Sequence, residues 1–128
     1  MLKSLTNFIA SDKPDAEDVL MCVLGLRRIE VKAYFELLKL GSADVKTVSK
    51  TLKRSRPTTQ RVLQDLVLKG LATRKQIVIG KGGYRYEYQP IPVSKLTEKV
   101  ETTLQDLSAK MIQSINELYQ KIASNQVS

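Results

Sequence analysis

The sequence predicts a mostly α-helical protein with one small β-hairpin, an α+β fold of low β content. Three observations predict this class. Apolar residues recur every three to four positions through much of residues 15–70, and again from residue 93 onward. Between these regions the pattern changes to alternation on either side of a glycine-rich run, residues 80–83. With 128 residues, the chain fits one domain, or a compact domain with an extended appendage.

The first part of the chain predicts helices that end at glycines. Residues 3–9 have a weak amphipathic pattern, and residues 15–24 form a clearer short helix that Asp15 can cap. Residues 27–40 carry apolar side chains at helical spacing, and Gly41 supplies the stop at their end. We therefore expect an N-terminal helical extension over residues 1–26.

Two further helices follow in close succession. Ser42 can cap a helix over residues 43–52, and Ser55 can cap the next one, where Pro57 falls in the first turn. Gly70 ends that helix. The side chains expected to face inward from it are Thr59, Val62, Leu63 and Leu66.

A β-hairpin is predicted around the glycine-rich run. Residues 71–79 are rich in β-branched side chains, and Tyr84, Tyr86 and Tyr88 alternate with polar residues until Pro90 stops the strand. The three tyrosines share one strand face. Stacking on single-stranded bases is conceivable for them, but packing against the helices is favoured because the opposite face is polar.

A long helix is predicted over residues 93–123, about 45 Å at 1.5 Å per residue. Its narrow apolar stripe is best covered by a partner helix, which makes a homodimer the expected assembly. The order of elements is that of a winged helix–turn–helix domain over residues 27–92, extended by a C-terminal dimerisation helix over residues 93–128. The dimerisation stripe comprises Leu96, Val100, Leu104, Leu107, Met111, Ile115, Leu118 and Ile122.

Positive charge is concentrated on the predicted winged unit. The chain has a net charge of +8, and residues 27–85 hold 15 Lys/Arg against four Asp/Glu, whereas the remainder holds six against nine. This asymmetry is typical of a protein that binds a polyanion, although a basic solvated surface would give the same count. The expected partner is double-stranded DNA.

The outward residues of the predicted winged unit have side chains suited to DNA. Arg can bond guanine, Gln can bond adenine, and Thr can contact a phosphate or a thymine methyl. Those near the start of the third helix are Ser55, Arg56, Thr58, Gln60, Arg61 and Gln64. Those expected to grip the backbone or minor groove from the wing are Arg74, Lys75, Lys81 and Arg85.

Catalysis and metal binding are disfavoured by the composition. The chain has no histidine, and its one cysteine, Cys22, lies in an apolar helix with no partner base. Gly80-Lys81-Gly82-Gly83 lacks the spacing of a phosphate-binding loop. No enzyme, metal or cofactor is expected. The single cysteine, the short apolar runs and the missing secretory signal favour a cytoplasmic protein without a membrane partner.

Several segments together resemble archaeal winged helix–turn–helix transcriptional regulators of the TrmB-like type. No single motif is diagnostic, but the order and spacing over residues 18–92 are. The segments are DVLMCVLGL at 18–26, EVKAYFELL at 30–38, VSKTL at 48–52, RPTTQRVL at 56–63, KGL at 69–71 and GGYRY at 82–86. The TTQR segment at 58–61 is also similar to the start of the recognition helix in MarR-like proteins.

The resemblance implies sequence-specific operator binding by a homodimer that regulates transcription. It implies recognition-helix roles for Thr58, Gln60 and Arg61, a wing role for Arg85, and dimer contacts through terminal helices. Larger TrmB-like proteins carry a C-terminal sugar-binding domain, whereas this sequence ends after one helix, so no effector pocket of that kind is expected. Two other classes fit the same basic face: an architectural or non-specific nucleic-acid binder, and a winged-helix module that docks an acidic protein.

Overall fold

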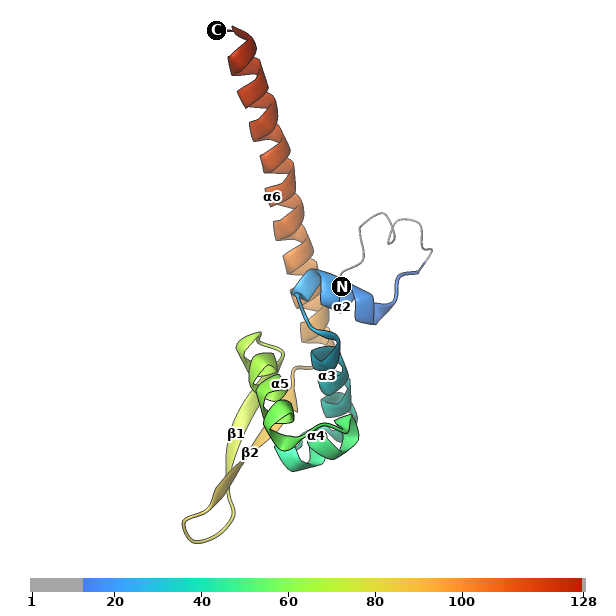
Figure 1. Ribbon diagram of the computed structural model, residues 1–128, viewed down its shortest axis with the longest axis vertical. Coiled ribbons are helices and arrows are strands. Elements are labelled where there is room, and N and C mark those ends of the chain that lie inside the picture. The colour runs from blue at the N-terminus through green and yellow to red at the C-terminus, as the bar shows by residue number, and fades with distance from the viewer. Residues whose placement is uncertain (1–12, 128) are drawn as a thin grey trace.

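The computed structural model describes residues 13–127 and places a small helical domain between two projections (Figure 1). A hairpin extends from one end of the domain, and a long helix leaves from the other. The weak helix expected over residues 3–9 lies outside the described residues. The elements in order are α2 (Ala16–Leu24), α3 (Arg28–Leu40), α4 (Val45–Leu52), α5 (Arg56–Leu68), β1 (Ala72–Val78), β2 (Tyr84–Pro90) and α6 (Val93–Val127).

The core lies where α3, α4 and α5 meet the base of the hairpin. Its centre includes Tyr34 and Leu37 of α3, Val48 of α4 and Leu63 of α5, all of which are fully buried. The four inward residues predicted for the third helix are all buried, so the helical spacing assigned its faces correctly. Leu20 and Met21 of α2 belong to the same core, so α2 packs as part of this domain.

The start of α4 differs from the sequence expectation. The helix begins at Val45 rather than Ala43, and its cap is Asp44, whose side chain accepts a hydrogen bond of 2.9 Å from the Thr47 amide. Ser42 is exposed and does not cap the helix. Ala43 exchanges two backbone hydrogen bonds with Tyr88, of 3.0 and 2.8 Å, and therefore keeps an extended conformation that excludes it from the helix.

The hairpin is an antiparallel pair in which Arg74 faces Tyr88 and Val78 faces Tyr84. Along one face of β2, Tyr88 is buried, Tyr86 half-buried and Tyr84 exposed. Packing against the helices, the favoured interpretation of these tyrosines, therefore holds fully only for Tyr88. The outer part of the hairpin extends beyond the core as a wing.

Among the described residues, the long helix α6 packs against the domain near its start. Leu96 is buried in the domain core and Val100 is partly buried against it, whereas Leu104 and the later members of the predicted stripe are exposed. With 35 residues, α6 is about 50 Å long. Leu96 is therefore occupied within its own protomer, and the unpaired stripe begins at Leu104.

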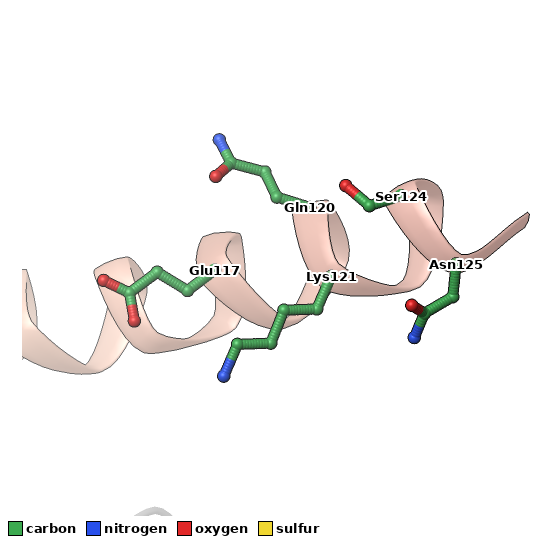
Figure 2. Close-up of a pocket in the computed structure, with 5 residues that line it drawn as sticks. All are labelled: Glu117, Gln120, Lys121, Ser124 and Asn125. Atoms are coloured by element: carbon green, nitrogen blue, oxygen red, sulfur yellow. The ribbon is translucent and has the colours of Figure 1, made fainter. Parts of the chain in front are cut away.

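No described element packs against the distal part of α6. A shallow hollow there is lined by Glu117, Gln120, Lys121, Ser124 and Asn125, all from this one helix (Figure 2). Side chains of a single straight helix diverge from its axis, so they cannot enclose a ligand. Within residues 13–127, no helix combines the length and apolar character needed to cross a bilayer.

Candidate nucleic-acid interface

The helix α5 presents a polar face whose position is fixed by a regular N-terminus. The Ser55 hydroxyl accepts from the Thr58 amide at 3.3 Å and donates to the Thr58 hydroxyl at 3.0 Å. Pro57 sits in the first turn, where its missing N–H leaves no bond unmade. The hydroxyl of Ser55 and both the amide and the hydroxyl of Thr58 are thus engaged in the helix cap. Ser55 is exposed and Thr58 is half-buried.

The other predicted recognition residues extend along the exposed face of α5. Arg56, Gln60, Arg61 and Gln64 are all exposed. The helical period turns Gln60, Arg61 and Gln64 away from the buried stripe, whereas Arg56 is exposed in the first turn of the helix. Their donors and acceptors are therefore open to a ligand that approaches this face. Five of the six predicted residues, Ser55, Arg56, Gln60, Arg61 and Gln64, are exposed, whereas Thr58 is half-buried.

The charges on this surface are unevenly paired. The four acidic side chains within residues 27–85 each lie near a cation: Glu30 near Lys69, Glu36 near Lys39, Asp44 near Arg85 and Asp65 near Arg27. In contrast, no ion pair joins the following cations to any described residue: Arg56, Arg61, Lys75 and Lys81. These four cations are available to an anionic partner.

The wing residues divide into free and engaged groups. Lys75 and Lys81 make no ion pair with any residue from 13 to 127, whereas the Arg74 guanidinium lies 4.1 Å from the centre of the Tyr86 ring. Arg85 Nε lies 3.9 Å from Asp44 Oδ2, which is a loose pair. The hydrogen bond from the Thr47 amide, with a smaller contribution from Arg85, holds the pKa of the Asp44 carboxyl below its usual value.

Two further exposed cations precede α5 and were not among the residues predicted to bind DNA. Lys53 closes α4 in a left-handed conformation (φ 57°), and Arg54 follows it. Both are exposed and precede the start of α5. The first helix of a helix–turn–helix and the turn after it cross the DNA backbone, so the basic run 53–56 itself was the signal that could have identified them.

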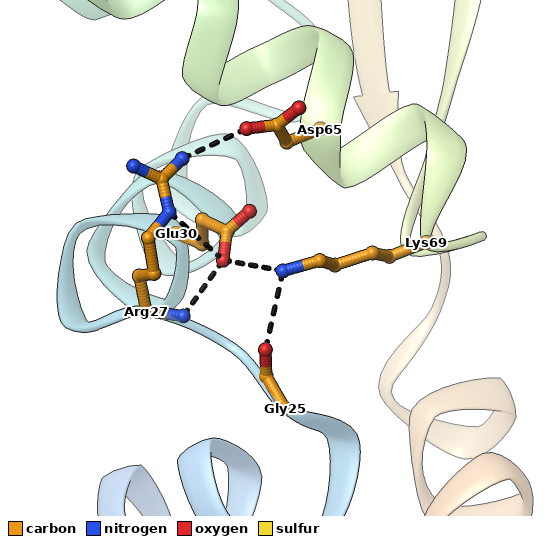
Figure 3. A network of polar contacts seen from close by, with 5 residues as sticks. All are labelled: Gly25, Arg27, Glu30, Asp65 and Lys69. Carbon is orange, nitrogen blue, oxygen red and sulfur yellow. Dashed lines mark hydrogen bonds and ion pairs between the residues drawn. The ribbon is translucent and has the colours of Figure 1, made fainter. Parts of the chain in front are cut away.

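A buried polar network supports α5 from behind. The Glu30 side chain is fully buried, and its Oε1 accepts from the Arg27 amide at 2.7 Å and from Lys69 Nζ at 2.8 Å (Figure 3). Lys69 also donates to the Gly25 carbonyl at 3.1 Å, and Arg27 bonds Asp65 at 2.8 Å. These contacts join both ends of the α2–α3 connection to the C-terminal half of α5.

The ionisation of Glu30 depends on this network. Burial alone would raise the pKa of its carboxyl, but the hydrogen bonds from Arg27 and Lys69 and the charges of both side chains outweigh burial and lower the pKa below its ordinary value. Glu30 is therefore an anion at neutral pH. The sequence reasoning missed it because a glutamate near the start of a helix is usually a solvated first-turn acid.

Comparison with known proteins places this architecture in a family. Residues 20–94 match the sequence profile described as the sugar-specific transcriptional regulator TrmB. The chain belongs to the TrmB family. TrmB proteins are transcriptional regulators rather than enzymes, and the hairpin after α5 is accordingly the wing of a winged helix–turn–helix fold.

Three archaeal proteins illustrate the similarity of this TrmB-family chain to known sequences and structures. MJ1503, an uncharacterized protein of Methanocaldococcus jannaschii, is 33% identical over 102 residues, which cover 80% of this chain and 77% of that protein. A possible transcriptional regulator from Methanosarcina mazei has a TM-score of 0.74 at 25% identity, covering 84% and 92% of the two chains. The archaeal chromatin protein TrmBL2 shares the fold, with a TM-score of 0.65 at 21% identity and coverage of 83% and 38%.

Proposed function

We propose that this TrmB-family chain is a sequence-specific regulator of transcription that binds double-stranded DNA as a cytoplasmic homodimer. The observation that carries the proposal is the outward face of α5, where Arg56 and Arg61 are exposed and have no ion-pair partner among the described residues. Recognition helices contact base edges with residues near their N-terminus. Arg61 bonds guanine and Gln60 or Gln64 bonds adenine in this proposal, because their side chains match those major-groove edges.

Phosphate contacts on either side of the recognition helix position it in the groove. Lys53 and Arg54 contact the backbone at the start of α5, and Lys75 and Lys81 contact it from the wing. Such contacts set the register and orientation of a protein on the duplex but carry little sequence information. They also release counterions, so affinity falls steeply with salt.

Dimerisation through α6 relates the two winged helix–turn–helix domains by a two-fold axis. The exposed stripe that supports it comprises Leu104, Leu107, Met111, Ile115, Leu118 and Ile122. From Met111 onward the steps are four, three and four residues, the spacing that lets two helices pack in a coiled coil. The two recognition helices then address half-sites about 34 Å apart, or a multiple of this distance.

Selection of bound duplexes from a random pool tests the proposal in one experiment. Enrichment of a palindrome is expected, because a two-fold dimer reads inverted half-sites. The binding constant of the enriched duplex should then fall by several orders of magnitude between about 50 and 200 mM salt, if six or more phosphates are contacted.

Three results would count against the proposal in different ways. A flat sequence pool with salt-sensitive binding would favour a non-specific or architectural binder. An enriched site without symmetry would contradict the homodimer. If the protein bound no duplex even at low salt, DNA would be excluded as the ligand and an acidic protein partner would be favoured.

A further inference from the structure

The tip of the wing exposes three apolar side chains, Val78, Ile79 and Tyr84, which we call the tip cluster. Val78 is 76% exposed, Ile79 54% and Tyr84 56%. Val78 and Tyr84 are cross-strand partners and therefore share one face of the hairpin. Ile79 follows directly, and its amide donates to the Gly83 carbonyl at 3.1 Å. Successive side chains of a strand point to opposite faces, so Ile79 lies on the other face from Val78 and Tyr84, and the end of the hairpin is apolar on both faces.

The tip cluster is not needed to fold the domain. The hairpin is anchored at its other end, where Tyr88 is buried and bonded to Ala43, and Figure 1 shows the tip as the part of the wing farthest from the helices. Exposed hairpin ends are ordinarily kept polar, because apolar strand edges promote aggregation. We therefore expect a binding partner to cover the tip cluster.

The surroundings of the cluster favour a polyanion as that occupant. Lys81 lies in the loop between Ile79 and Tyr84, and Lys75 and Arg85 lie on the strands behind. The nearest acidic side chain along the wing, Glu87, stands opposite Lys75 in the register. An apolar centre with a basic rim matches duplex DNA, whose charged backbones flank stacked apolar bases.

The loop that carries Lys81 is slender enough to approach a groove closely. Gly80 and Gly82 have φ values of 123° and 74°, which side-chain-bearing residues rarely adopt. A Cβ added at either would meet nothing within 4 Å, so the backbone conformation, rather than crowding within the protein, requires glycine there. The tip consequently presents backbone, one lysine and the tip cluster.

We propose that the tip cluster is a wedge that enters the minor groove beside each half-site, partly unstacks one base step and bends the duplex. This inference rests on the proposed binding of double-stranded DNA. Apolar side chains inserted at the minor groove kink duplexes by about 20–90°. Pyrimidine–purine steps such as TA unstack most readily, so bending adds a sequence preference at positions that the recognition helix does not touch.

Energy transfer between dyes on the two ends of a duplex measures the bend. The probes are two duplexes of about 30 base pairs, one with several TA steps and one with rigid A-tracts. The variant Val78→Thr/Ile79→Thr keeps β-branched side chains but makes the tip polar. Val93→Thr is the matched control, because Val93 is equally exposed at the start of α6, away from the wing. The melting temperatures of both variants verify that they fold.

The wild-type protein and Val93→Thr should increase energy transfer on the TA duplex. The double variant should lose most of that increase, bind the TA duplex roughly ten-fold more weakly, and bind the A-tract duplex within about three-fold of wild type. A 2-aminopurine base in a TA step should brighten with the wild type and stay quenched with the double variant, since its fluorescence reports unstacking.

The possible failures are distinguishable. DNA binding by the wild type without a change in energy transfer would overturn the wedge while leaving the proposed function intact. Equal bending by the wild type and the double variant would remove the tip cluster as its cause. A wild-type protein that bound neither duplex at low salt would overturn the proposed function, and the wedge with it.

Discussion

At the scale of single residues, the basic side chains of the proposed DNA-binding surface differ in whether they contact another side chain of the protein. Arg56 and Arg61 on α5 have no ion pair with a described residue, whereas Arg85 lies near Asp44 and Arg74 lies over Tyr86. An unpaired guanidinium can bond a base without first giving up a protein contact. In the proposed complex Arg85 exchanges its loose contact with Asp44 for a phosphate, so its net contribution to DNA affinity should be smaller.

Replacing Arg61 by Ala should relax sequence preference, whereas replacing Lys81 by Ala should weaken binding to all duplexes alike. Loss of a bidentate base contact costs about 1–3 kcal/mol at one base position, and loss of a phosphate contact lowers the salt slope by about one. Competition binding between the selected site and its single-base variants, repeated at several salt concentrations, separates the two effects. Unchanged binding by both variants would mean that this face of the protein does not contact DNA.

Replacing Glu30 by Gln should destabilise the fold at neutral pH by about 1–3 kcal/mol, because it removes the anion that accepts from Lys69 and Arg27. The lowered pKa means that the contribution of Glu30 is complete above its ordinary value of 4.5 and is lost as the pH falls through the folded-state value. The difference between variant and wild type should therefore shrink in acid. Urea unfolding at several pH values measures it.

Glu36→Gln is the matched control for this experiment. Glu36 pairs with Lys39 on the surface of the same helix at 3.4 Å, and its loss should change stability by less than about 1 kcal/mol. A Glu30→Gln penalty that stayed constant from neutral to acid pH would contradict the electrostatic role of Glu30.

At the scale of elements, the start of α4 was decided by a contact from a distant strand. Ser42 and Asp44 are both residue types that favour helix caps. The choice fell to Asp44 because Ala43 bonds Tyr88, 45 residues later in the chain. The bridge also brings Asp44 within reach of Arg85, so the α4 cap and the wing share an electrostatic contact.

Replacing Asp44 by Ala should cost about 1 kcal/mol of stability, because it removes the cap bond to the Thr47 amide. Ser42→Ala should stay within about 0.5 kcal/mol of wild type, since the exposed Ser42 side chain caps nothing. Thermal or urea unfolding of the two variants side by side measures the difference. Equal losses would show that Ser42 shares the cap in solution.

At the scale of the whole molecule, α6 carries a long apolar stripe that no other described element covers. Leu96 and Val100 anchor α6 to the domain, and the exposed seam extends from Leu104 to Ile122. In the proposed homodimer, two α6 helices pack through this stripe and place the two winged domains on opposite sides of a two-fold axis.

Replacing Leu107 by Glu should yield monomers in sedimentation, because it places a charge in the proposed seam without touching the domain core. Gln105→Glu adds a charge at a neighbouring exposed position and should leave the dimer intact. Leu96→Glu should instead unfold the protomer, because Leu96 is buried in its core. An unchanged mass for Leu107→Glu would exclude this part of α6 from the dimer contact.

The sequence alone predicted the winged architecture, the buried face of α5 and one long C-terminal helix, which extends to Val127 rather than ending at residue 123. These features arise from local periodicity and from glycine and proline signals, which act over a few residues. The same periodicity placed Gln60, Arg61 and Gln64 on the exposed side of α5, whereas Thr58, also expected to face outward, is half-buried. The family assignment agrees, because the order of these segments characterises the matched region, residues 20–94.

The tertiary structure alone decided the features that depend on residues far apart in the chain. The cap of α4, the burial of Glu30 against Lys69 and the assignment of Leu96 to the core were of this kind. So were the separation of free from engaged arginines and the exposure of the tip cluster. Each depends on which side chain or backbone arrives from another element, and periodicity within one segment carries no information about that partner.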